Sequence, residues 1–129
     1  MTDLFSIELP EVRATLKVAG ALRPEELSEL FGVQGKSYRV PPLPGIWEYS
    51  TTRERTIDAV SHLATILAVV HPHLQEFRDL IVEKGLDVDL QLSVRAGRGE
   101  QPTGYVDAIR IAELAAMGAG LDIQLRSRD

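Results

Sequence analysis

Three histidines are the side chains of this sequence best suited to binding a metal ion. His71 and His73 flank Pro72, and His62 precedes them on the same predicted helical segment. Zinc needs three or four ligands converging at about 2 Å, and the sequence has no HExxH spacing. We therefore expect these histidines at the surface or at helix ends and predict no metal and no cofactor; a metal site is the alternative.

Nucleophilic and acid–base chemistry find little support in the sequence. No serine lies in a GxSxG or SxxK pattern, and the absence of cysteine removes thiolate chemistry. Two acidic pairs, Glu25 with Glu26 and Asp87 with Asp89, could exchange protons. Carboxylates at such positions also complement a helix dipole or solvate an outer sheet face. We lean toward a protein that is not an enzyme.

A phosphate-binding loop would lie between a strand and a helix, where Gly97, Gly99 and Gly104 occur. Their spacing matches neither GxGxxG nor the Gly-Lys-Ser/Thr pattern. These glycines therefore predict a loop and no nucleotide site.

The segment from Gly35 to Arg55 concentrates aromatic and arginine residues in a chain that is otherwise poor in aromatics. Protein interfaces favour such side chains. We predict a binding surface with Tyr38 and Arg39 exposed and Trp47 largely buried beneath them. The full candidate set is Tyr38, Arg39, Trp47, Tyr49 and Arg53, with Arg55 close by in sequence. The alternative is that Trp47 only fills the core.

Alternating apolar residues predict the strands that must position these side chains. Strands are expected over 12–18, 46–51, 86–95 and 121–126, the third being the clearest alternation. Helices are expected over 24–31, 56–84 and 106–117, with a kink or break at Pro72. The breakers between Val33 and Gly45 predict an exposed loop.

The two halves of the chain look alike, which suggests two βαβ units joined by a helical pair. Val18-Ala19-Gly20 ends the first strand much as Arg95-Ala96-Gly97 ends the third. Chance recurrence of turn residues is the alternative. Strands with one polar face favour an open sheet covered by helices on one side. We predict an α+β fold with about four strands, of the ferredoxin-like kind.

The run ALRPEELSELFG, from Ala21 to Gly32, follows the first strand and precedes Gly45-Ile46-Trp47. Together with Pro72 and the stretch from Leu114 to Ile123, it resembles a bacterial family of small uncharacterised domains, domain-of-unknown-function family 4279. The resemblance spans most of the chain and implies a fold but no catalytic residues. Tyr105-Val106-Asp107 departs from it, since Ser or Pro with Glu would be expected there.

Composition limits the classes of partner. The 129 residues fit one domain, residues 1–129, and 19 acidic against 14 basic residues give a net charge of -5 that disfavours nucleic acid. The longest apolar run, Leu63 to Val70, is too short to cross a membrane. The N-terminal residues Met1 to Pro10 lack a basic region and a long apolar run, so we expect a cytoplasmic protein.

Three possible functions remain after these exclusions. We favour a non-catalytic module that binds a protein or a small ligand and that could self-associate as a homodimer through a sheet face or edge. The alternatives are a small enzyme whose site forms no linear motif and an immunity-like inhibitor that neutralises another protein by charge.

Overall fold

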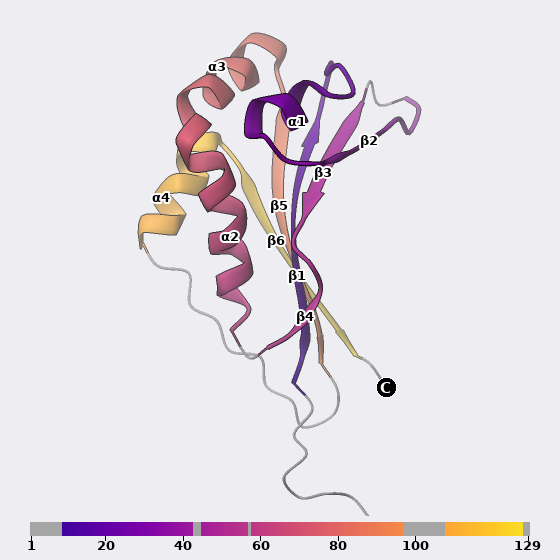
Figure 1. Cartoon of the computed structure of the whole chain (residues 1–129), viewed down its shortest axis with the longest axis vertical. Coiled ribbons are helices and arrows are strands. Elements are labelled where there is room, and N and C mark those ends of the chain that lie inside the picture. The colour runs from indigo at the N-terminus through magenta and orange to yellow at the C-terminus, as the bar shows by residue number, and fades with distance from the viewer. Residues whose placement is uncertain (1–8, 43–44, 57, 97–107, 128–129) are drawn as a thin grey trace, which may run out of the picture.

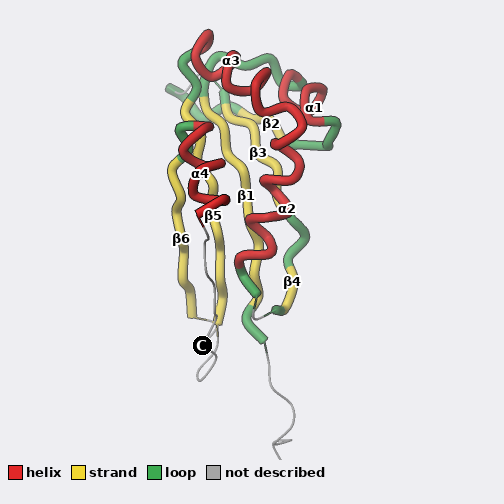
Figure 2. Tube along the Cα trace, turned by 90° about the vertical axis from the view of Figure 1, so that its left-hand side faces the viewer, coloured by secondary structure: helices red, strands yellow, loops and turns green. Residues whose placement is uncertain are grey.

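All the strands belong to one twisted sheet, and the helices lie on one of its faces (Figures 1 and 2). This computed structural model describes residues 9–42, 45–56, 58–96 and 108–127. The predicted α+β class with helices on one face is confirmed. In chain order the elements are β1 (Glu11–Ala19), α1 (Glu26–Phe31), β2 (Lys36–Tyr38), β3 (Ile46–Ser50), β4 (Glu54–Arg55), α2 (Val60–Val70), the 3-10 turn η1 (His71–His73), α3 (Leu74–Lys84), β5 (Asp87–Ala96), α4 (Ala108–Met117) and β6 (Gly120–Ser127).

The sheet has the order β2-β3-β1-β5-β6, and β4 pairs with the start of β1. β1 is central and antiparallel to both β3 and β5, whereas β6 is parallel to β5. Because side chains alternate between the two faces of a strand, one apolar row of β1 lies beside one apolar row of β5. The register pairs Leu16 with Leu90 and Val18 with Val88.

The core lies between these rows and the helices. Val88, Leu90 and Leu92 are 5%, 0% and 4% exposed, which confirms the predicted buried stripe of this strand. α2 contributes Leu63 and Ile66, both buried, and lies across β1 in Figure 2. Within the described residues, no helix is long and apolar enough to cross a membrane.

Pro72 divides the long helical segment as expected. α2 passes into η1 at His71, and α3 follows directly from Leu74. The ring of Pro72 has no amide hydrogen to donate, so the regular helix is interrupted there. α3 ends at Gly85, whose φ of 60° is left-handed and suits glycine. Phe77, fully buried, holds α3 against the rest of the core.

The second strand of the first predicted βαβ unit is not the one expected: the strand predicted over 46–51 is β3, which is antiparallel to β1, whereas β2 runs parallel to β1. After α1 the chain forms β2, reverses, and runs back as β3 in the direction opposite to β1. The β5-α4-β6 half is a true parallel βαβ unit, but its two strands are direct neighbours. In a ferredoxin-like fold another strand splits each such pair. The β5–β6 pair is not split in this way, but β3 lies between the parallel strands β1 and β2, and β1 lies between the parallel strands β3 and β5. The sheet has six strands where about four were predicted.

The other face of the sheet carries no helix in the described part of the chain and is polar (Figure 1). Arg13 and Asp89 are exposed on it, as their alternation with apolar neighbours predicts. Thr15 belongs to the same face yet is only 8% exposed, and its hydroxyl is satisfied by a 2.7 Å hydrogen bond shared with that of Ser50. We call this surface the open face.

Candidate functional site

The predicted recognition segment meets the rest of the molecule where α1, β2 and β3 come together. α1 ends at Gly32, whose φ of 66° is left-handed, and residues 33–35 lead the chain into β2. β2 then pairs with β3 so that Ser37 lies opposite Trp47. The loop predicted over 33–45 therefore contains a short strand, which is too brief to show a periodic pattern.

A close approach between Gly35 and Trp47 fixes this corner. A Cβ atom built on Gly35 would lie 2.3 Å from Cε2 and Nε1 of the indole, so this position has no room for a side chain. Trp47 is 2% exposed, which confirms the prediction that it is buried. The ring is also tilted against Phe31, with centroids 5.9 Å apart.

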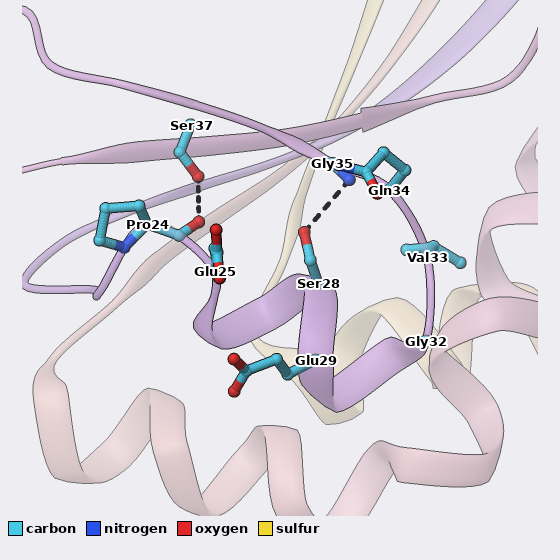
Figure 3. Close-up of a pocket in the computed structure, with 9 residues that line it drawn as sticks. All are labelled: Pro24, Glu25, Ser28, Glu29, Gly32, Val33, Gln34, Gly35 and Ser37. Carbon is cyan, nitrogen blue, oxygen red and sulfur yellow. Dashed lines mark hydrogen bonds between the residues drawn. The ribbon is translucent and has the colours of Figure 1, made fainter.

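The hydroxyl of Ser28 joins three elements at this corner. Its Oγ accepts a hydrogen bond from the Trp47 Nε1 at 3.0 Å. It accepts another from the Gly35 backbone N–H at 3.1 Å, which is drawn in Figure 3. Because both donors are held by one atom of α1, the helix, β2 and β3 are fixed relative to one another. The sequence analysis missed this role, since a serine on a short helix carries no distinguishing signal.

One hollow beside this corner lies between α1 and β2. It has a volume of about 600 Å³, and Figure 3 shows Glu25 and Glu29 on its helix side with Gln34 across from them. Three of its polar side chains, those of Ser28, Ser37 and Glu29, are engaged within the protein. Ser37 Oγ donates to the Pro24 carbonyl, and Glu29 lies 3.5 Å from the Arg23 guanidinium. We find there no nucleophile paired with a base.

A smaller cavity shares Pro24 and Ser37 with this hollow but has a different character. Its volume is about 90 Å³, close to that of one aliphatic side chain. Leu22, Pro24, Ile46 and Trp47 give it apolar walls. Arg23 and Arg39, both exposed, belong to its lining as well, and Ser37, Tyr38 and Gly45 complete it. We call it the arginine-rimmed cavity.

A third hollow, of about 580 Å³, opens on the open face beside β2. Arg13 and Lys36 bring positive charge to it, and Glu48 brings negative charge. The hydroxyls of Thr15 and Ser50 are hydrogen-bonded to each other, as described above. The segment from Gln34 to Arg39 therefore borders hollows on both faces of the sheet edge.

Three of the five predicted recognition residues line one cavity, a fourth stacks on one of these three, and the fifth lies apart. Tyr38, Arg39 and Trp47 all line the arginine-rimmed cavity. Tyr49 stacks on Trp47 with ring centroids 6.4 Å apart and faces the helices. Arg53 lies near the far end of β1, where it and Arg55 approach the Glu11 carboxylate at 3.4 and 3.0 Å. Proximity in sequence was misleading because β3 carries the chain away from the cavity.

Tyr38 is half-buried, against the prediction that it is exposed, and its hydroxyl is not free. It donates a hydrogen bond to Glu48 Oε1 at 2.5 Å on the open face. This hydrogen bond, burial and the negative charge of Glu48 together raise the pKa of Tyr38 to about 12. The protonated phenol therefore links β2 to β3 through this hydrogen bond.

We expect the stability of the protein at alkaline pH to depend on this hydrogen bond. Between about pH 10 and pH 12 the unfolded chain loses the Tyr38 proton while the folded chain keeps it, so stability falls across that range. Tyr38→Phe removes this contribution and should flatten the fall, as followed by urea unfolding from about pH 9 to pH 12. Tyr49→Phe is the matched control. Equal pH dependence in the Tyr38→Phe variant and the wild type would contradict the assignment.

An ion pair holds the start of α1 in place. Lys84 Nζ donates to Glu26 Oε1 at 2.8 Å and to Oε2 at 3.1 Å, which links the end of α3 to α1. These hydrogen bonds, with one from the Arg23 backbone N–H, lower the pKa of Glu26 against the opposing effect of burial. The helix that supplies Ser28 is thus anchored at its first turn.

The histidines do not form a metal site in the part of the chain that the structure describes. His62 is buried rather than at the surface, and it lies in the first turn of α2, a helix end as expected. Its Nδ1 shares a 2.7 Å hydrogen bond with Thr51 Oγ1, while His71 is exposed at the helix junction. His73 lies against the ring of Phe31, with centroids 6.2 Å apart. The glycines considered for phosphate binding, Gly97, Gly99 and Gly104, lie outside the described residues.

Comparison with known proteins gives one match. The family model described as "Domain of unknown function (DUF4279)" matches residues 10–128, nearly the whole chain. No curated protein and no solved structure matches significantly.

Proposed function

Because the chain belongs to the family of domains of unknown function DUF4279, whose description names no activity, we propose its function from the geometry of the site. The protein is a non-catalytic protein-binding module that takes one apolar side chain of its partner into the arginine-rimmed cavity. The observation that carries this proposal is the pairing of apolar walls with two exposed guanidiniums around a cavity of about 90 Å³.

The chemistry of the cavity defines the partner. Interfaces concentrate their binding energy where an anchor side chain fills a desolvated pocket, with Arg and aromatic residues prominent around it. Arg39 can donate a forked pair of hydrogen bonds to a carboxylate, and Arg23 can do so in exchange for its exposed 3.5 Å contact with Glu29. We therefore expect a partner segment with an aliphatic side chain flanked by acidic residues.

The walls of the arginine-rimmed cavity are already held in place before a partner binds. Trp47, which forms one wall, is held by the Ser28 hydroxyl and by contact with Gly35. A preformed pocket loses less conformational entropy on binding than one that must be ordered first. The rigidity of this corner therefore favours recognition over a purely structural role.

A short peptide can test this proposal. The probe is the tripeptide Asp-Leu-Asp with an acetylated N-terminus and an amidated C-terminus. It is titrated into isotopically labelled protein while backbone and indole NMR signals are followed. We expect weak, saturable shifts at Leu22, Arg39 and Trp47. The peptide with Lys in place of both Asp residues should bind more weakly, and replacing its Leu by Gly should abolish binding.

We expect Arg39→Ala to weaken binding of the acidic probe several-fold, or by about 1 kcal/mol, because Arg39 is exposed and its ion pair is solvent-screened. The free energy of unfolding should change by less than about 0.5 kcal/mol, as is usual at the surface. Arg78→Ala, an exposed arginine of α3, is the matched control. Shifts that appear away from the cavity, or binding that is equal in both variants, would refute the proposal.

A further inference from the structure

β6 forms one edge of the sheet, and no other strand in the described part of the chain pairs with its outer side. All eight residues of β6 pair in unbroken register with β5 on the inner side. Exposed strand edges are usually shortened, interrupted by proline or bulged, because unpaired backbone groups recruit other strands. The opposite edge, β2, has three residues, whereas β6 has eight and contains no proline.

The side chains of β6 divide into an apolar row and a polar row. Leu121, Ile123 and Leu125 continue the buried row of β5 toward the edge, yet they are 37%, 52% and 71% exposed. Asp122, Gln124 and Arg126 alternate with them and lie on the open face. Gln124 Nε2 donates to Asp122 Oδ2 at 3.2 Å. The apolar row grows more exposed toward the end of the strand.

The sequence of this strand is complementary to itself. If two copies pair antiparallel about a two-fold axis at Gln124, then Asp122 lies opposite Arg126 of the partner subunit, and the reverse pair follows by symmetry. In the same register Ile123 lies opposite the partner's Leu125. Moving the axis by one residue to Ile123 would place Arg126 opposite the partner's Gly120 and leave both charges unmatched.

We infer that β6 is a homodimerisation edge, and that its partner is a second copy of this chain joined in the Gln124-centred register. Pairs of apolar side chains and pairs of oppositely charged side chains both stabilise neighbouring antiparallel strands. The two sheets then become one continuous sheet with all helices on the same side. Ile111 of α4, 55% exposed, lies on the same helical side of the sheet as the apolar row of β6.

This inference goes beyond the proposed function and does not depend on it. The arginine-rimmed cavity lies at the β2 end of the sheet and β6 at the other end, so the order of strands keeps the two surfaces apart. A dimer would present two such cavities, one at each end of the joined sheet. An interface of one strand pair is small, and we expect a Kd in the micromolar range.

Charge exchange at β6 gives the decisive experiment, read by sedimentation of the full chain from about 1 to about 500 μM. Arg126→Asp leaves two acidic residues facing each other, and Asp122→Arg leaves two basic ones. We expect the dimerisation Kd of each variant alone to be at least about tenfold higher than that of the wild type. An equimolar mixture of the two variants restores both ion pairs and should dimerise as the wild type does.

Controls separate this interface from other contacts. Arg78→Asp, which changes an exposed charge on α3, should leave the dimer unchanged, and circular dichroism should show that all variants fold. Because the chain has no cysteine, Gln124→Cys offers a second readout. We expect oxidation to link its two copies, whereas Ser93→Cys, one strand further in, should not be linked.

Three outcomes would overturn the inference. The first is a wild-type chain that stays monomeric at every concentration. The second is a dimer that neither single charge variant weakens. The third is a mixture of the two variants that associates no better than each variant alone.

Discussion

Leu90→Ala should destabilise the protein by about 2 to 5 kcal/mol, the cost of deleting a buried leucine side chain. Leu90 is fully buried at the centre of the sheet, paired with Leu16 on β1 and with Leu121 on β6. Strands on both sides restrain the backbone, so the cavity left behind cannot readily collapse. Chemical denaturation followed by circular dichroism measures the change.

The matched control for this prediction lies on the same strand. Asp87→Ala changes an exposed side chain of β5 that points to the open face, and should cost less than about 0.5 kcal/mol. A Leu90→Ala loss as small as that of the control would mean that the face of β5 in contact with the helices is wrongly assigned.

Gly35→Ala should cost about 1 to 3 kcal/mol, as expected for a methyl group forced into a closely packed site. The added Cβ would lie 2.3 Å from the indole of Trp47, so either the ring or β2 must move. Movement of the ring would stretch its hydrogen bond to Ser28 and disturb the wall of the arginine-rimmed cavity. The expected result is thus a joint loss of stability and of affinity for the acidic peptide.

A double-mutant cycle isolates the cause of the Gly35→Ala loss. Trp47→Phe removes the Nε1 and Cζ2 atoms that the new methyl group would meet. Gly35→Ala should therefore cost less in the Trp47→Phe background than in the wild type. The cycle must be followed by circular dichroism, since Trp47 is the only tryptophan. Equal costs in the two backgrounds would rule out the steric explanation.

The elements with strong periodic patterns were predictable from the sequence. The alternation in β5 and the interruption at Pro72 arise from local rules that hold wherever the segment packs. β2 was not predictable, because three residues between a glycine and a proline-rich turn show no period. The strand exists through its backbone pairing with β3 and through the contact of Gly35 with Trp47.

Strand direction and the candidate site depend on contacts distant in sequence, which a linear pattern does not record. The likeness of Val18-Ala19-Gly20 to Arg95-Ala96-Gly97 does not reveal which strands become neighbours: β3 separates β1 from the next strand, β2, whereas β5 and β6 lie side by side. Arg23 and Leu22 reach the cavity from the β1–α1 connection, and no spacing links them to Arg39. The buried Thr15 likewise depends on Ser50 across the sheet.

The central place of β1 has a consequence for how the chain is made. β1 is synthesised early, but one of its two long neighbours, β5, belongs to the last third of the chain. During translation the apolar row of β1 can be covered by α2 and flanked by β3 while its other side still awaits a partner. Folding must then close a long loop before the sheet is complete, a step that slows folding and exposes intermediates to aggregation. A nascent chain halted before β5 would therefore be a natural client of ribosome-associated chaperones.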